Sequence, residues 1–405
     1  MAQAIIIVSL LFLAVSVAVP DGVVNIHVDS SEALFETFDE YLSVDLDWWT
    51  GENGRVAWEN CGLLSLDLNN ARLKNLAKEL GGGYLRLGGS LDVSVKYLYS
   101  KEVEQWCKTP AINHEKKWNL CLNFSRWDEI NKFAAESNLK LVFGISYPGA
   151  NTQKSSSVPP LNITQNSALL QYSISKGYDL AAIELGEEIA PADPESFKNF
   201  VDAYKMMKNE IINLWPDMST RPKLLGPCFG MSDAVGKDKC EGNTTCEVTE
   251  LVKNFLQATL PEGQSNNIID GYCLHGYNDD GGDHWKHAGF NSEILHQAIA
   301  LKRSLKKYDN TIPLWVGESG PHNHGGIENV TDRFICKYSP NNYAVNLSYL
   351  LTHRNSHMLY ASQLLYGTPM HWAHSLVLVS ASLDDKLWYV LCKQQIYNFL
   401  EDYRI

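Results

Sequence analysis

Segments of strand length alternate with segments of helical periodicity along most of this 405-residue chain. We predict eight apolar segments as strands: Tyr41–Asp47, Tyr84–Gly89, Leu141–Ser146, Ala181–Gly186, Leu224–Cys228, Ile268–Tyr277, Pro313–Glu318 and Leu359–Tyr366. Strict alternation implies a parallel sheet, and eight units predict an α/β fold, a closed (β/α)8 TIM barrel. An open doubly wound sheet is the alternative. No Gly-x-Gly-x-x-Gly follows an early strand, however, so a dinucleotide fold lacks its main signal.

The segments between these strands carry apolar residues at helical spacing. One helix is predicted around Leu73–Leu80, and a second has Trp127, Ile130 and Ala134 on one face. Further helices are expected near residues 168–176, 248–258, 292–307, 343–353 and 387–400. Asp193-Pro194-Glu195 predicts a helix start, with Asp193 as the N-cap and Pro194 in the first turn.

Two of the predicted strands end in glycine followed by glutamate. Glu187 and Glu188 follow Gly186, and Glu318 follows Gly317. A barrel carries its active site at the carboxyl ends of its strands, which is where these acids fall. Two facing carboxylates are the equipment of a glycosidase, with Glu188 as acid/base and Glu318 as nucleophile, about 5 to 5.5 Å apart in a retaining enzyme. The alternative is that both are solvated residues at strand ends.

Three further strand residues are candidates for this site. Arg86 could keep Glu318 ionised through a charge-assisted hydrogen bond, or it could pair with Glu184 inside the barrel. Tyr277 could donate to the nucleophile, or it could be a half-buried strand tyrosine. His275 lies two positions earlier on the same segment and is a candidate substrate contact.

The composition limits the possible partners and the compartment. A net charge of −13 argues against a broad nucleic-acid or heparin-binding surface. Residues 5–17 are apolar and are followed by small residues, which predicts a signal peptide over residues 1–18. No later stretch is long enough for a transmembrane helix. We therefore expect secretion, or delivery to a lysosome or vacuole through the secretory pathway.

The sequons and cysteines agree with that expectation. Five Asn-x-Ser/Thr sites follow the predicted signal peptide, at Asn123, Asn162, Asn243, Asn329 and Asn346. Nine cysteines in an oxidising compartment should partly pair and leave at least one odd. The close pairs Cys107 with Cys121 and Cys240 with Cys246 are the candidates.

Several segments together resemble one known family. They are residues 43–47 (SVDLD), 84–90 (YLRLGGS), 126–131 (RWDEIN), 141–144 (LVFG), 175–178 (SKGY), 184–186 (ELG), 315–319 (WVGES) and 325–326 (GG). The resemblance spans roughly Val24 to Gly367 and is to glycoside hydrolase family 79, the heparanase and β-glucuronidase family. The 126–129 segment looks more like the plant-type members.

The resemblance implies a (β/α)8 barrel with an attached β-sandwich, and hydrolysis of β-glucuronide bonds in glycans or conjugates with retention. It places the acid/base at Glu188 and the nucleophile at Glu318. It makes Asp47 and Ser90 sugar contacts and Tyr277 an active-site tyrosine. The backbone amides of Gly325 and Gly326 would hold the glucuronate carboxylate, because glycine lets amides approach an anion closely. No cofactor is implied.

The chain departs from the family in several places, and two of these departures bear most on its function and organisation. Glu187 stands where the family usually has asparagine, and an ionised glutamate there can only accept hydrogen bonds and would repel a glucuronate. The chain also ends at Ile405, so the sandwich is expected to be largely missing. The expected organisation is residues 1–18 as signal, 19–40 as an N-terminal strand segment that a partner could complete, and 41–405 as the barrel.

Two alternatives to an active glucuronidase remain open. A carbohydrate-binding pseudoenzyme of the same family would retain the sugar site with impaired turnover, which Glu187 and the missing sandwich favour. A metal site could instead form among Asp283, His284, His287, His322 and His324, although loop histidines this close usually do other things.

Overall fold

The computed structural model describes residues 40, 43–48, 63–64, 66–108, 120–150, 157–235, 246–260, 267–277, 293–309, 311–320 and 356–358. All of them belong to one compact unit that runs from Leu34 to Ser375. A second unit combines Met1–Ala33 with Leu376–Arg404 and lies outside the described residues.

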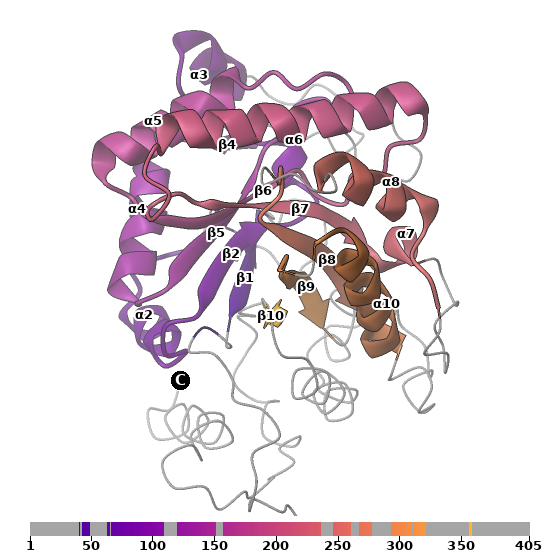
Figure 1. The fold of residues 1–405 in the computed structure, drawn as a ribbon. Helices are drawn as coiled ribbons and strands as arrows, with labels where there is room; N and C mark the ends of the chain where they lie inside the picture. Colours follow the sequence, from indigo (N-terminus) through magenta and orange to yellow (C-terminus); the bar gives the residue numbers. More distant parts are fainter. Residues whose placement is uncertain are drawn as a thin grey trace, which may run out of the picture. The chain divides into compact units, whose positions relative to one another are not determined.

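Eight strands form one sheet in which spatial order follows chain order (Figure 1). The strands are β1 (Val44–Asp47), β2 (Tyr84–Gly88), β5 (Lys140–Ile145), β6 (Leu180–Leu185), β7 (Lys223–Gly230), β8 (Gly271–Tyr277), β9 (Leu314–Gly320) and β10 (Ser356–Met358). Every pairing between neighbours is parallel. Eight consecutive parallel strands confirm the predicted α/β fold of the (β/α)8 type. The eighth lies earlier than predicted, since β10 ends just before Leu359.

Helices connect consecutive strands of this sheet. They are α2 (Ala71–Lys78), α3 (Lys101–Lys108), α4 (Phe124–Glu136), α5 (Thr164–Lys176), α6 (Pro194–Leu214), α7 (Met231–Ala234), α8 (Glu250–Thr259) and α10 (Glu293–Tyr308), with a short 3-10 turn η3 (Asp92–Ser94) after β2. The predicted start of α6 is confirmed. Asp193 is its N-cap, and its carboxylate accepts hydrogen bonds from the backbone amides of Glu195 and Ser196.

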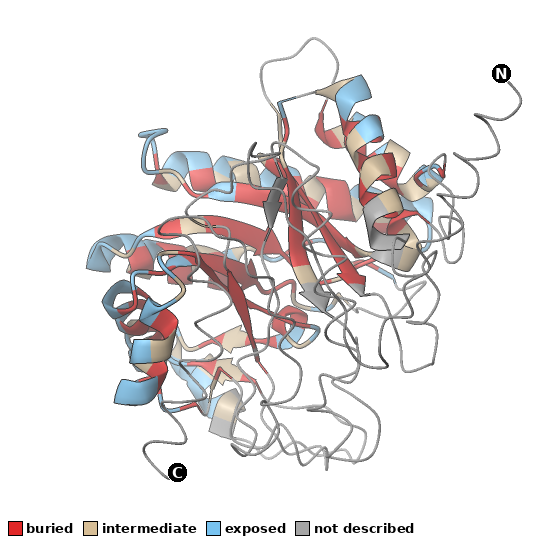
Figure 2. Ribbon diagram, turned by 90° about the horizontal axis from the view of Figure 1, so that it is seen from below, coloured by how far each residue is buried: buried red, intermediate tan, exposed pale blue. Residues whose placement is uncertain are grey.

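The two faces of the sheet are packed differently. One face carries the main core, in which strand residues such as Leu85, Phe143 and Ile183 pack among helix residues such as Trp127. The opposite face carries a smaller cluster: Tyr84, Val142, Ala182, Leu225, Cys228, Cys273 and Trp315. Figure 2 shows the strands buried along most of their length and the helices exposed on their outer sides. Strands buried on both faces are typical of parallel sheets covered by helices.

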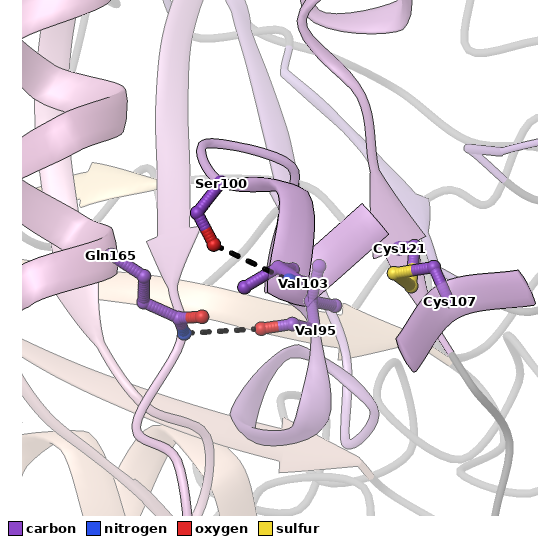
Figure 3. Close-up of a disulfide and its surroundings, with 6 residues drawn as sticks. All are labelled: Val95, Ser100, Val103, Cys107, Cys121 and Gln165. Carbon is purple, nitrogen blue, oxygen red and sulfur yellow. Dashed lines mark hydrogen bonds between the residues drawn. A yellow bond between two sulfur atoms is a disulfide. The ribbon is translucent and has the colours of Figure 1, made fainter. Parts of the chain in front are cut away.

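A small two-stranded sheet, which the sequence did not predict, lies between β2 and α4 in the chain. It pairs β3 (Lys96–Tyr97) with β4 (Cys121–Leu122). The predicted disulfide between Cys107 and Cys121 is present and ties α3 to β4 (Figure 3). Cys246 is also disulfide-bonded, but its predicted partner Cys240 lies outside the described residues.

Several predictions concern residues that the structure does not describe. The signal peptide, the N-terminal strand segment, residues 343–353 and 387–400, and three of the five sequons fall there. Of the two described sequon asparagines, Asn123 and Asn162, both are exposed. Within the described part of the chain, no helix combines the length and apolarity needed to cross a membrane.

Candidate active site

The site begins one layer above the smaller cluster, on the same face of the sheet. Successive side chains of a strand point to opposite faces, so residues two apart share a face. Two positions after the cluster residues Tyr84, Ala182 and Cys273 come Arg86, Glu184 and His275. On this face of the sheet, the apolar layer is therefore followed by a charged layer nearer the carboxyl ends of the strands.

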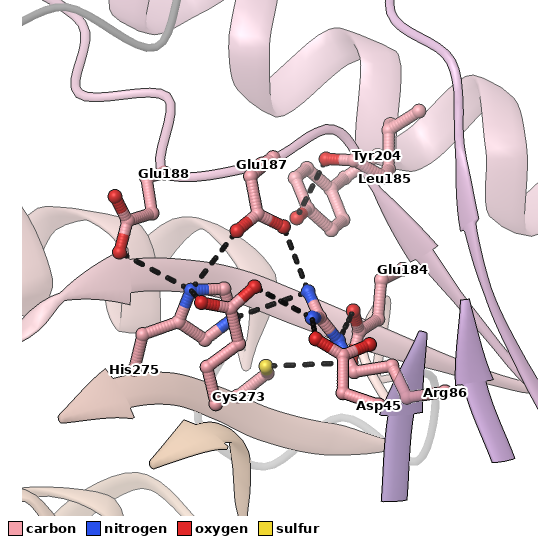
Figure 4. Close-up of polar contacts among 10 residues, drawn as sticks. Asp45, Arg86, Glu184, Leu185, Glu187, Glu188, Tyr204, Cys273 and His275 are labelled. Atoms are coloured by element: carbon pink, nitrogen blue, oxygen red, sulfur yellow. Dashed lines mark hydrogen bonds and ion pairs between the residues drawn. The ribbon is translucent and has the colours of Figure 1, made fainter. Parts of the chain in front are cut away.

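Arg86 is the centre of this charged layer and is fully buried. Its Nε donates to Glu184 Oε2 at 2.7 Å, and its Nη1 donates to Glu318 Oε1 at 2.7 Å and to Asp45 Oδ2 at 3.2 Å. Its Nη2 donates to Glu187 Oε2 at 2.7 Å (Figure 4). The sequence left open whether Arg86 binds Glu318 or Glu184, and it binds both. We call Arg86, His275 and the carboxylates of Asp45, Glu184, Glu187 and Glu318 the Arg86 cluster.

Glycine makes room for this cluster at two positions. A β-carbon on Gly88 would lie 2.5 Å from the guanidinium carbon of Arg86, and one on Gly317 would lie 2.8 Å from His275 Nε2. Any larger residue there would displace a charged side chain from its partners. The glycine that precedes Glu318 is therefore explained by the side chains packed against it.

The two predicted catalytic acids converge on His275. Parallel pairing sets His275 on β8 opposite Glu318 on β9. Its Nδ1 lies 3.2 Å from Glu188 Oε1 and 3.9 Å from Glu318 Oε2. These two oxygens are therefore at most about 7 Å apart, a bound that is compatible with the roughly 5 to 5.5 Å of a retaining glycosidase and does not distinguish it from an inverting one. Residues 130 positions apart share one small region, as the predicted function requires.

Glu188 differs from the other acids in backbone and exposure. Its φ is 45°, in the left-handed region that residues with a side chain rarely adopt. Its side chain is 35% exposed, whereas that of Glu318 is 13% exposed and that of Glu187 only 2%. Strained residues of this kind cluster at functional sites, where the surrounding structure holds them. Glu188 is thus the acid that solvent and ligands reach most easily.

Glu187 is buried between the two positive side chains. Besides accepting from Arg86, its carboxyl places Oε1 3.2 Å from His275 Nδ1. Burial, followed by the negative charge of Glu318, raises the pKa of Glu187 to about 8, against the opposing effects of His275 and Arg86. The raised pKa therefore favours the protonated form of Glu187 near neutral pH, and in that form the carboxyl can donate a hydrogen bond.

The other charges of the layer follow from burial and mutual proximity. Burial opposes the charge on both Arg86 and His275, but the surrounding carboxylates outweigh it and raise the pKa of each well above its usual value. Burial also raises the pKa of Asp92 well above the usual range. No hydrogen-bond partner reaches either carboxyl oxygen of Asp92 from the described residues. Asp92 is therefore a buried acid whose protonated form is favoured by its burial.

The remaining predicted site residues are only partly placed. Asp47 ends β1 and Tyr277 ends β8, but the structure does not describe their side chains. Ser90 follows β2 and is exposed. Gly325, Gly326 and the five candidate metal ligands of the loops lie outside the described residues.

The sequence reading missed two acids near the site. Asp45 lies two residues before Asp47 on one strand, and alternation alone puts both on the same face. Asp92 lies in a short turn that has no periodic signal.

Two sets of donors in this region have spacing that could suit a metal ion. Glu184, Cys228, Cys273 and His275 form one, and Glu187, Glu188 and His275 form the other. Arg86 already makes contact with Glu184, Glu187 and His275. A cation in either set would face the guanidinium, so we assign no metal to them.

The comparisons with known proteins agree with this geometry. The N-terminal domain of glycosyl hydrolase family 79 matches residues 23–339. Heparanase-like protein 3 of Arabidopsis thaliana is 24% identical over 75% of this chain and 55% of its own length. Baicalin-beta-D-glucuronidase of Scutellaria baicalensis is 26% identical over 74% of this chain and 58% of its own. The chain spans about half the length of the curated relatives it matches.

One solved structure that aligns with the chain is the family 44 xyloglucanase of Paenibacillus polymyxa with xyloglucan. It has 10% sequence identity and a TM-score of 0.44, and the match covers 80% of this chain and 73% of that one. So low a score carries no conclusion of its own. The match of the family 79 domain covers most of the chain, and the chain therefore belongs to glycosyl hydrolase family 79.

Proposed function

We propose that this chain carries the active site of a retaining β-glucuronidase of the secretory pathway. The observation that carries the proposal is the convergence of Glu188 and Glu318 on one nitrogen of His275, beside the buried Arg86. Membership of family 79 and the similarity to a baicalin-beta-D-glucuronidase support a glucuronide as the substrate.

The contacts of each acid suit one role in the reaction. Arg86 donates a charge-assisted hydrogen bond to Glu318, which favours the ionised carboxylate that a nucleophile must be. Glu188 is the more exposed acid, so it can reach the glycosidic oxygen and protonate it as the aglycone leaves. Glu318 attacks the anomeric carbon to form a glycosyl-enzyme. Glu188 then acts as base and activates the water that hydrolyses this intermediate.

A neutral Glu187 fits an anionic sugar better than an ionised one. An ionised carboxylate beside Glu188 would repel the carboxylate of a glucuronate. The raised pKa of Glu187 removes that charge below about pH 8. The departure from the family's asparagine therefore does not by itself argue for loss of activity.

A fluorogenic β-glucuronide tests the proposal, with the α- or β-anomer of the first product followed by NMR. Wild-type protein is expected to turn it over with retention, and Glu318→Gln is expected to lower kcat by at least about a thousandfold, as loss of a catalytic group does. Glu195→Gln, at an exposed helical glutamate, is the matched control and should keep wild-type activity. Binding of the glucuronide without turnover would instead indicate a carbohydrate-binding protein.

A further inference from the structure

Two carboxyl groups compete for one proton at the centre of the site. His275 Nδ1 lies 3.2 Å from Glu187 Oε1 and also 3.2 Å from Glu188 Oε1. The other ring nitrogen, Nε2, lies 3.3 Å from Arg86 Nη2, which can only donate. Carboxyl oxygens face Nδ1, so Nδ1 carries a hydrogen. The Nδ1–H of His275 is therefore equally distant from two carboxyl oxygens and can donate a well-aligned hydrogen bond to only one of them.

We propose that Glu187 is a positioning residue whose own proton decides whether His275 donates its Nδ1 hydrogen to Glu188 or to Glu187. The proposal rests on the proposed function, because it gives Glu188 the catalytic role. It extends that function to the preceding residue, Glu187, whose carboxyl shares the His275 donor with that of Glu188.

The contacts of Glu187 limit which of its two oxygens can hold a proton. Arg86 Nη2 donates to Oε2 at 2.7 Å, so the acid proton belongs on Oε1. A protonated Oε1 is a weak acceptor, which leaves the N–H of His275 to hold Glu188. An ionised Oε1 is charged and takes that N–H, because hydrogen bonds to charged groups are about twice as strong as neutral ones. Glu188 then loses its donor and gains a negative neighbour.

Charged and titratable groups surround Glu187 on several elements. Arg86 comes from β2, His275 from β8 and Glu318 from β9, while Glu184 lies on β6 and Glu188 is the next residue. Asp92 on η3 and Asp45 on β1 complete the set, so the carboxyls outnumber the two cations. Such an excess of buried acids requires some of them to stay protonated. Glu187 is the buried acid that contacts both cations, and its pKa of about 8 places its proton loss just above neutral pH.

The experiment is a log kcat profile against pH for wild type and two neutral variants, Glu187→Gln and Glu187→Asn. In wild type, the ionisation of Glu187 adds one proton loss to the alkaline limb, so this limb should be steeper than in a protein that lacks this titration. Each neutral variant lacks that proton loss, so its alkaline limb should be less steep by the slope of one proton. Either variant should exceed wild type above about pH 8, where Glu187 would be ionised.

Glu195→Gln is the control and should reproduce the wild-type profile. An alkaline limb of the same slope in wild type and in the neutral variants would overturn the proposal. Infrared spectra give a readout independent of turnover. The difference spectrum of wild type minus Glu187→Gln should contain a carboxylic-acid band at pH 6 that disappears above about pH 8. If this band is missing at pH 6, Glu187 does not hold the proton. If wild type hydrolyses no glucuronide, the proposed function fails, while this band still decides the state of Glu187.

Discussion

At the scale of single residues, the site contains buried ionisable groups and a strained backbone, which lower the stability of the fold unless other contacts compensate for them. Arg86 and Glu184 are fully buried, Glu187 is a buried acid with a raised pKa, and Glu188 has a left-handed backbone. A buried charge is tolerated when it is paired and hydrogen-bonded. Arg86 meets that condition, since its five N–H groups serve four carboxylates. The strain at Glu188 has no such compensation in the described contacts.

Replacing Glu188 should therefore separate stability from activity. Glu188→Gly and Glu188→Ala both lack the acid, and both should lose turnover. Glycine adopts a φ of 45° without the clash that a β-carbon makes, so the glycine variant should be the more stable by about 1 kcal/mol. Urea denaturation of the two variants measures the difference. An alanine variant at least as stable as the glycine variant would show that this backbone is not strained.

At the scale of elements, the disulfide between Cys107 and Cys121 fastens α3 to the short strand β4. The bond closes a loop with a sequence separation of 14, in a region where β3 and β4 pair over only two residues each. So short a ladder contributes little by itself. The bond should limit the freedom of this segment mainly in the unfolded chain.

Removing both cysteines tests that contribution. The double variant Cys107→Ala/Cys121→Ala should lose about 3 kcal/mol of unfolding free energy, the amount expected for a closed loop of this length. Urea denaturation of oxidised wild type and the variant gives the value. The single variant Cys107→Ala lacks the same bond and should lose a similar amount. A loss below about 1 kcal/mol in both would mean that the surrounding packing already fixes this segment.

At the scale of the whole molecule, the sequence predicted the frame better than the details of the site. Seven of the eight strands and the positions of Glu188, Glu318 and Arg86 follow from apolar segments of strand length and from Gly-Glu strand ends, which are local signals. The two-residue strands β3 and β4 carry too few residues to show alternation. The burial of Asp92 and the raised pKa of Glu187 depend on side chains that come from other strands. No local sequence pattern predicts such long-range contacts.

The charge balance of the whole fold predicts how its stability depends on pH. The pKa of Glu187 is about 8 in the folded chain, against about 4.3 for a free glutamate. Between these values the folded state holds a proton that the unfolded state releases, so this group makes the protein less stable as pH rises through that window. Glu187→Gln removes the titration and keeps the shape of the side chain.

The stability advantage of Glu187→Gln over wild type should therefore grow from about pH 4.5 to about pH 8 and then stay constant, reaching a few kcal/mol at most. Urea denaturation at pH 5, 7 and 9 measures it, with Glu195→Gln as a control that should run parallel to wild type. Parallel curves for Glu187→Gln and wild type would mean that the proton is not held on Glu187. The excess of carboxyls around Arg86 would then have to be relieved at another acid of the cluster, with Asp92 the first to examine because burial raises its pKa as well.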